Sequence, residues 1–110
     1  MEILDACFRI INDAEQDTHL NYTKYYVGVT LNSRHLNIAR LMPKHSFLKA
    51  EVFVADADEW IKKLEAVRFK VHLSERRDDR FKFRINNEDI VPNELLLREL
   101  FVGAYAYCRG

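Results

Sequence analysis

The chain has 110 residues, 48% of them hydrophobic, and its 17 basic side chains balance its 17 acidic ones. This length and composition predict a single globular domain, residues 1–110, and exclude an intrinsically disordered chain. No apolar stretch approaches the roughly 20 residues that a membrane helix needs, and the acidic start of the chain is unlike a signal peptide. We therefore expect no membrane association and a cytoplasmic location, where Cys7 and Cys108 remain thiols.

The balanced charge is sorted along the chain. The net charge by segment is −4 for residues 1–23, +5 for 24–50, −3 for 51–67, +4 for 68–84 and −2 for 85–110. The positive segments have the sequence patterns of strands, and the negative segments have those of helices. A fold that places strands on one side and helices on the other is therefore expected to have one positive and one negative side. Such a charge distribution is relevant to the partners that the domain binds.

The first part of the chain predicts a helix, a loop and a strand. Residues 2–15 place apolar side chains three and four positions apart, which is the spacing of an amphipathic helix. Residues 16–23 are polar and predict a loop. From Lys24 to Leu31 the apolar side chains alternate with others, which is typical of a half-buried strand.

Two further strands are expected in the next part of the chain. Asn32–Ser33 is a candidate for the turn that precedes the first of them. In the run from Arg34 to Met42 the alternation changes phase between Ile38 and Ala39, and one extra residue, a β-bulge, would restore it. Residues 47–54 alternate again and predict a third strand.

The last part of the chain predicts two helices and two strands. Residues 56–67 and 93–107 have helical spacing, while 69–73 and 80–85 alternate on either side of a charged turn at 74–79. The expected order is helix, three strands, helix, two strands, helix. Short connections make the strands antiparallel, so we predict an α+β fold with a single, mostly antiparallel five-stranded sheet and helices packed on one face.

Basic side chains share the face of this sheet that points away from the helices. If Phe81, Phe83 and Ile85 point toward the helices, the alternating positions point outward. Cations there could bind phosphates, and neighbouring aromatic rings could stack on bases, as in proteins that bind single-stranded nucleic acid. The alternative is a solvated face, because a one-sided antiparallel sheet needs polar residues outside. The candidate nucleic-acid-binding residues are Lys49, Lys70, His72, Arg80, Lys82 and Arg84.

Three aromatic side chains, Tyr26, Phe47 and Phe53, are also expected to lie exposed on the outer face. Clustered exposed rings often mark an interface. The last predicted helix, moreover, is apolar around more than half of its circumference. A protein-interaction or homodimerisation domain, using the sheet face or this helix, is therefore the alternative to a domain that binds nucleic acid or another polyanion.

Catalytic and metal-binding signatures are not found in the sequence. The four histidines form no i, i+4 pair on a predicted helix, and no Cys-x-x-Cys occurs. His72 is expected to titrate near the reference pKa of about 6.5, while Cys7 and Cys108 are interpreted as core residues. We expect no cofactor and no metal, and a non-catalytic binding module is favoured over an enzyme.

One stretch of the chain has features shared with a known group of domains. These features are the "YYVGV" strand, a Pro-Lys turn before an alternating strand, "DEWIKKLEAV" and "RFKFRI". Over residues 24–107 the chain resembles small bacterial domains of unknown function that often form the C-terminal end of proteins acting on DNA. Many of those domains have a glycine after the second helix, where this chain has Arg68. The resemblance implies an α+β fold and transfers no catalytic residue.

Overall fold

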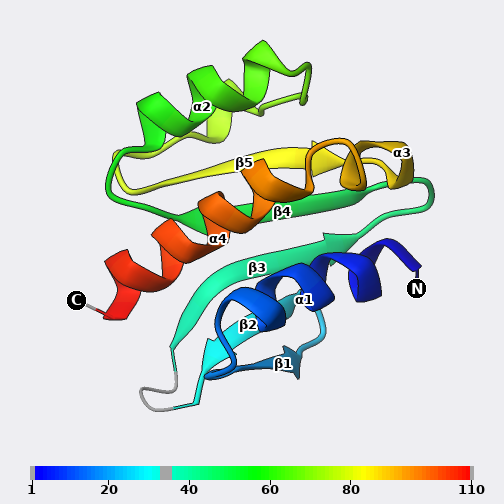
Figure 1. Ribbon diagram of the computed structural model, residues 1–110, viewed down its shortest axis with the longest axis vertical. Coiled ribbons are helices and arrows are strands. Elements are labelled where there is room, and N and C mark those ends of the chain that lie inside the picture. The colour runs from blue at the N-terminus through cyan, green and yellow to red at the C-terminus, as the bar shows by residue number, and fades with distance from the viewer. Residues whose placement is uncertain (1, 33–35, 110) are drawn as a thin grey trace.

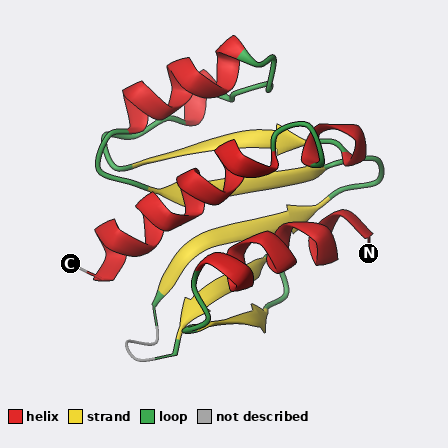
Figure 2. Cartoon of the chain, in the orientation of Figure 1, coloured by secondary structure: helices red, strands yellow, loops and turns green. Residues whose placement is uncertain are grey.

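The structure is a computed structural model that describes residues 2–32 and 36–109. Five antiparallel strands form one sheet in which every strand lies beside its sequence neighbour, in the order β1-β2-β3-β4-β5. Helices α1 and α4 cross the same face of this sheet (Figures 1 and 2). The elements are α1 Glu2–Ala14, β1 Thr18–Tyr22, β2 Val27–Leu31, β3 Asn37–Pro43, β4 Leu48–Phe53, α2 Ala57–Ala66, the 3₁₀ turn η1 Leu73–Glu75, β5 Arg80–Ile85, α3 Asn87–Ile90 and α4 Glu94–Arg109.

The predicted α+β class and the five-stranded antiparallel sheet are confirmed, but the element order differs from the prediction at β1, at residues 69–73 and at the short helix α3. Strand β1 lies where a loop was expected, because its polar residues pair with β2 at the edge of the sheet. Residues 69–73 were expected to form a strand, yet only Val71 there forms a bridge, with Phe83. Leu73, at the end of this segment, begins η1 and is 57% exposed.

The predicted β-bulge is confirmed in β3. Val29 faces Ala39 and Thr30 faces Asn37, so Ile38 is the extra residue. Both Ile38 and Ala39 are fully buried, which explains why two successive apolar residues occur in this strand. The predicted turn at Asn32–Ser33 lies at the gap in the described residues, which excludes 33–35.

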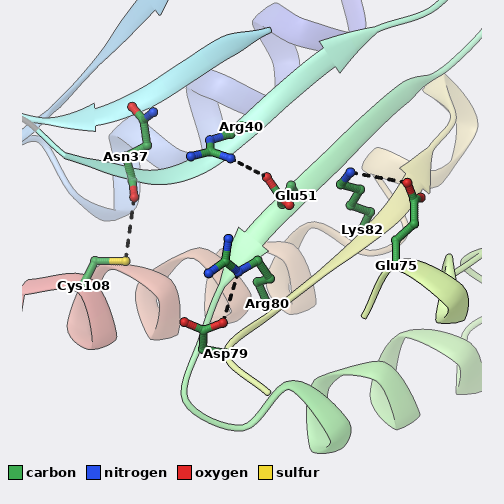
Figure 3. Close-up of polar contacts among 8 residues, drawn as sticks. All are labelled: Asn37, Arg40, Glu51, Glu75, Asp79, Arg80, Lys82 and Cys108. Atoms are coloured by element: carbon green, nitrogen blue, oxygen red, sulfur yellow. Dashed lines mark hydrogen bonds and ion pairs between the residues drawn. The ribbon is translucent and has the colours of Figure 1, made fainter. Parts of the chain in front are cut away.

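Asn37 holds the bulged end of β3 in place. Its Oδ1 accepts a hydrogen bond of 2.7 Å from the Thr30 hydroxyl, and its carbonyl oxygen lies 3.9 Å from Cys108 Sγ at the end of α4 (Figure 3). Its side chain also occupies the space above Gly28. A Cβ at position 28 would lie 2.5 Å from Asn37 Oδ1, so any larger residue there would force the Asn37 side chain to move.

The core lies between the sheet and the helices. Phe83 is fully buried, with its ring 5.5 Å from Phe69 in an edge-on arrangement and 5.8 Å from Phe81. The core combines β5 with residues of α2 and α4: Phe81, Phe83, Leu64, Leu97 and Leu100 are fully buried, and Trp60 and Val71 pack against the core while partly buried.

The two sides of the molecule differ in charge. The helices α1 to α4 contain ten acidic and five basic residues, whereas the strands contain five basic residues and one acidic residue. None of the α-helices in the described part of the chain lies over the second face of the sheet (Figure 1). No helix among the described residues is long and apolar enough to cross a membrane.

Candidate nucleic-acid interface

The outer face, meaning the face of the sheet opposite α1 and α4, consists of alternate residues of β3, β4 and β5. Its cross-strand pairs are Lys49 with Arg84, Glu51 with Lys82, Phe53 with Arg80, and Arg40 with Glu51. The alternation of β5 places Phe81, Phe83 and Ile85 in the core, so its three basic residues all belong to the outer face.

The segment before η1 extends this face beyond β5. His72 N–H donates to the carbonyl oxygen of Lys82, and Arg84 N–H donates to that of Lys70, both at 2.9 Å. These two bonds flank the Val71–Phe83 bridge, so Lys70 and His72 lie on the outer face while Val71 packs on the core. The structure therefore brings together all six residues that the sequence predicted as nucleic-acid-binding.

Arg40 also lies on the outer face, beside the six predicted residues, and the sequence analysis did not include it. The bulge at Ile38 restores the alternation from Ala39 onward, and with that phase Arg40 points to the same side as its cross-strand partner Glu51. The signal was therefore present in the sequence, in the position of Arg40 between the buried residues Ala39 and Leu41.

The three rings expected to be exposed are half-buried instead, because arginine side chains cover them. The Arg40 guanidinium carbon lies 5.2 Å from the ring centres of both Tyr26 and Phe53. Arg80 lies 5.0 Å from the centre of Phe53, and Arg84 lies 4.3 Å from the centre of Phe47. Arginine side chains and aromatic rings are therefore in contact on the outer face.

Carboxylates neutralise part of the positive charge. Glu51, which is buried, pairs with Arg40 at 3.2 Å, and Asp79 pairs with Arg80 at 3.1 Å (Figure 3). Glu75 of η1 pairs with both Lys49 and Lys82. Six cations, namely Arg40, Lys49, Lys70, Arg80, Lys82 and Arg84, thus stand against three carboxylates, which leaves an excess of three positive charges.

His72 departs from its sequence expectation. Burial lowers its pKa below the usual 6.5, and the neighbouring Lys49 lowers it further, although Glu75 acts in the opposite direction. His72 is therefore less readily protonated than an ordinary histidine and adds little charge to the outer face at neutral pH. The pKa of Glu75 is lowered, mainly by the hydrogen bond from Lys49, so this carboxylate is ionised at neutral pH.

A hollow of about 230 Å³ opens on the outer face. A water molecule takes up roughly 30 Å³ of liquid, so the hollow has room for several waters or for one small anionic group. Its wall contains three cationic side chains and two carboxylates. The lining residues are Glu51, Ser74, Glu75, Arg77, Arg80 and Lys82.

A second surface, the α2–α4 groove, lies on the helical side and has a volume of about 720 Å³. Val91 and Leu95 line it and are 83% and 76% exposed, and Val67 at the end of α2 is 44% exposed. Lys63 and Glu94 also line the groove. Part of the apolar surface of α4 that the sequence indicated is therefore open to solvent.

The described residues show neither a metal site nor an activated thiol. No three His, Cys, Asp or Glu side chains within residues 2–32 and 36–109 are arranged to hold a metal ion. Both cysteines are free thiols. Burial raises the pKa of the Cys7 thiol to about 12, and burial also raises that of Cys108. Neither thiol is thus activated as a nucleophile at neutral pH.

Comparison of the chain with protein-family models, with curated proteins and with solved structures found no match.

Proposed function

We propose that the domain is a non-catalytic module that binds single-stranded nucleic acid on its outer face, in the cytoplasm. The observation that carries this proposal is the set of close arginine–aromatic contacts on a sheet face with an excess of positive charge. Phosphates would pair with the cations, and bases would stack on the guanidinium groups. RNA-binding proteins stack bases on arginine guanidinium groups as well as on aromatic rings.

Two further observations favour a single strand over a duplex. The acidic helices on the opposite side of the sheet would repel a duplex that wrapped around the domain. Base stacking, in addition, needs bases that are free of a partner strand. The resemblance to domains found in proteins that act on DNA is compatible with this proposal.

A titration with salt tests the proposed function. We expect a fluorescently labelled single strand of about ten nucleotides to bind weakly and with little sequence preference. If Lys70, Arg80, Lys82 and Arg84 each neutralise one phosphate, the slope of log affinity against log salt should be about −3, because a single strand releases about 0.7 counterion per contact. Fluorescence anisotropy at low salt measures both quantities. No binding at tens of micromolar protein would contradict the proposal.

Self-association through the α2–α4 groove is the second candidate function. Its support is the exposure of Val91 and Leu95 beside each other in the groove. The occupant we propose is a second copy of the chain. Lys63 and Glu94 line the same groove, so two copies related by a two-fold axis could pair opposite charges while they cover the apolar side chains.

Sedimentation equilibrium tests this second function. We expect a species of twice the 13.0 kDa chain mass at high protein concentration. The double variant Val91→Asp and Leu95→Asp should sediment as a 13.0 kDa monomer. The control variant Tyr25→Asp removes an equally exposed apolar side chain outside the groove and should remain dimeric. A wild-type chain that is monomeric at every concentration would exclude this function.

A further inference from the structure

One carboxylate, that of Glu75, occupies the centre of the basic part of the outer face. Its Oε2 lies 2.9 Å from Lys49 Nζ and 3.8 Å from His72 Nδ1, and its Oε1 lies 3.4 Å from Lys82 Nζ. The contact with Lys82 is drawn in Figure 3. Lys49, His72 and Lys82 come from β4, from the segment beside β5 and from β5 itself, so three neighbouring stretches of the sheet converge on a single anion.

The turn that holds Glu75 is weakly attached. Turn η1 has only three residues and none of them is buried. The side chain of Leu73 is 57% exposed, and the backbone bonds within the turn are those from Glu75 N–H to His72 and from Arg76 N–H to Leu73. The flanking residues are held at the sheet by the bonds from His72 N–H to Lys82 and from Arg77 N–H to Arg80, and Arg76 pairs with Asp58. A segment with few buried contacts opens at small cost in free energy, so Glu75 can leave its position without disturbing the core.

The groups that Glu75 would leave behind can hold an anion. Arg77, Arg80 and Lys82 line the hollow beside Glu75. Three enclosed nitrogen atoms of the outer face, Arg40 Nε, His72 Nε2 and Arg84 Nε, have no hydrogen-bond partner among the residues that the structure describes. Such groups are costly to leave unpaired, and a ligand that supplies several acceptor oxygens offers partners for them.

We infer that Glu75 occupies, in the free protein, the position that a phosphate group takes in the complex, with Lys49 and Lys82 as its cationic ligands. This inference rests on the proposed binding of nucleic acid at the outer face. The carboxylate and the phosphate compete for the same two lysines. Binding of the phosphate displaces η1, and Glu75 therefore lowers the affinity of the outer face for polyanions.

The variant Glu75→Gln tests this inference, because it keeps the shape of the side chain and removes its charge. We expect it to bind a labelled single strand about fivefold more tightly than the wild-type chain, since two exposed ion pairs, each individually weak, no longer compete with the phosphate. Glu99→Gln on α4 is the matched control, an exposed acidic residue away from the outer face, and its affinity should remain near that of the wild type.

The measurement is fluorescence anisotropy with two probes, the same oligonucleotide with and without a 5′-phosphate. A gain with both probes assigns the site to a phosphate between nucleotides, and a gain only with the 5′-phosphorylated probe assigns it to a terminal phosphate. If the wild type and Glu75→Gln bind the probes with equal affinity, the competition between Glu75 and phosphate is overturned, while the proposed function stands. Failure of both chains to bind either probe overturns the proposed function as well. Thermal melts of the variants should coincide with that of the wild type, which excludes an effect of unfolding.

Discussion

Replacing Phe83 by alanine is expected to lower the free energy of unfolding by about 3–5 kcal/mol. Phe83 is fully buried between Phe69 and Phe81, and its cross-strand neighbour Ala50 is too small to fill the space that the ring would leave. A loss of this size is a large part of the 5–15 kcal/mol that stabilises a typical domain. Urea denaturation followed by circular dichroism measures it.

Two comparisons keep this prediction testable. Phe47→Ala removes a half-buried ring from the outer face, where solvent can enter the space, and should destabilise the chain less. If Phe83→Ala does not fold at all, Phe83→Leu, which retains most of the volume, should fold with a loss below about 1.5 kcal/mol. A loss below about 1 kcal/mol for Phe83→Ala, against the 3–5 expected, would mean that the two faces of β5 are assigned the wrong way round.

Reversing Lys82 and Arg84 to glutamate together is expected to abolish binding of single-stranded nucleic acid. The double reversal changes the charge of the outer face from an excess of three positive charges to an excess of one negative charge. It also removes the guanidinium plane that covers Phe47. Phosphate contacts dominate the affinity of such complexes, so an outer face with the opposite sign repels the strand.

The control for the double reversal carries the same change in charge on the helices. Arg9 on α1 and Lys62 on α2 are exposed, and the variant with both changed to glutamate should bind much as the wild type does. Both double variants should retain the melting behaviour of a folded domain, because Arg9 and Lys62 are exposed and Lys82 and Arg84 are only partly buried. Binding that survives the reversal of Lys82 and Arg84 would favour the protein-interaction alternative.

The fold could be predicted wherever burial imposed a regular pattern. The alternation in β5 and the bulge at Ile38 both follow from which side chains face the helices, so they were readable in the sequence. Strand β1 was missed because a polar edge strand carries almost no alternation of this kind. The segment 69–73 was predicted as a strand but forms only one bridge. Alternation indicates which side a residue faces, and it does not indicate whether the backbone forms the hydrogen bonds of a strand.

The candidate site could be predicted only in part, for a related reason. Alternation placed the cations on one face, but contacts between strands depend on register and side-chain length. The reach of Arg40 from β3 to Phe53 on β4 depends on the bulge, and that contact is one reason why the rings are covered. Glu75 belongs to an irregular turn, and no periodic signal predicted its position over Lys49 and Lys82.

The separation of acidic helices from a basic sheet face also has a consequence for how the domain approaches a charged partner. It gives the molecule a permanent dipole directed from the helices toward the outer face. The radius of gyration is 12.6 Å, close to the roughly 10 Å over which charge is screened at 0.1 M salt. The field of a polyanion would therefore orient the domain with its outer face toward the polyanion before the surfaces touch. This orientation increases the fraction of collisions that are productive. Salt would then slow the encounter itself, in addition to weakening the complex once formed.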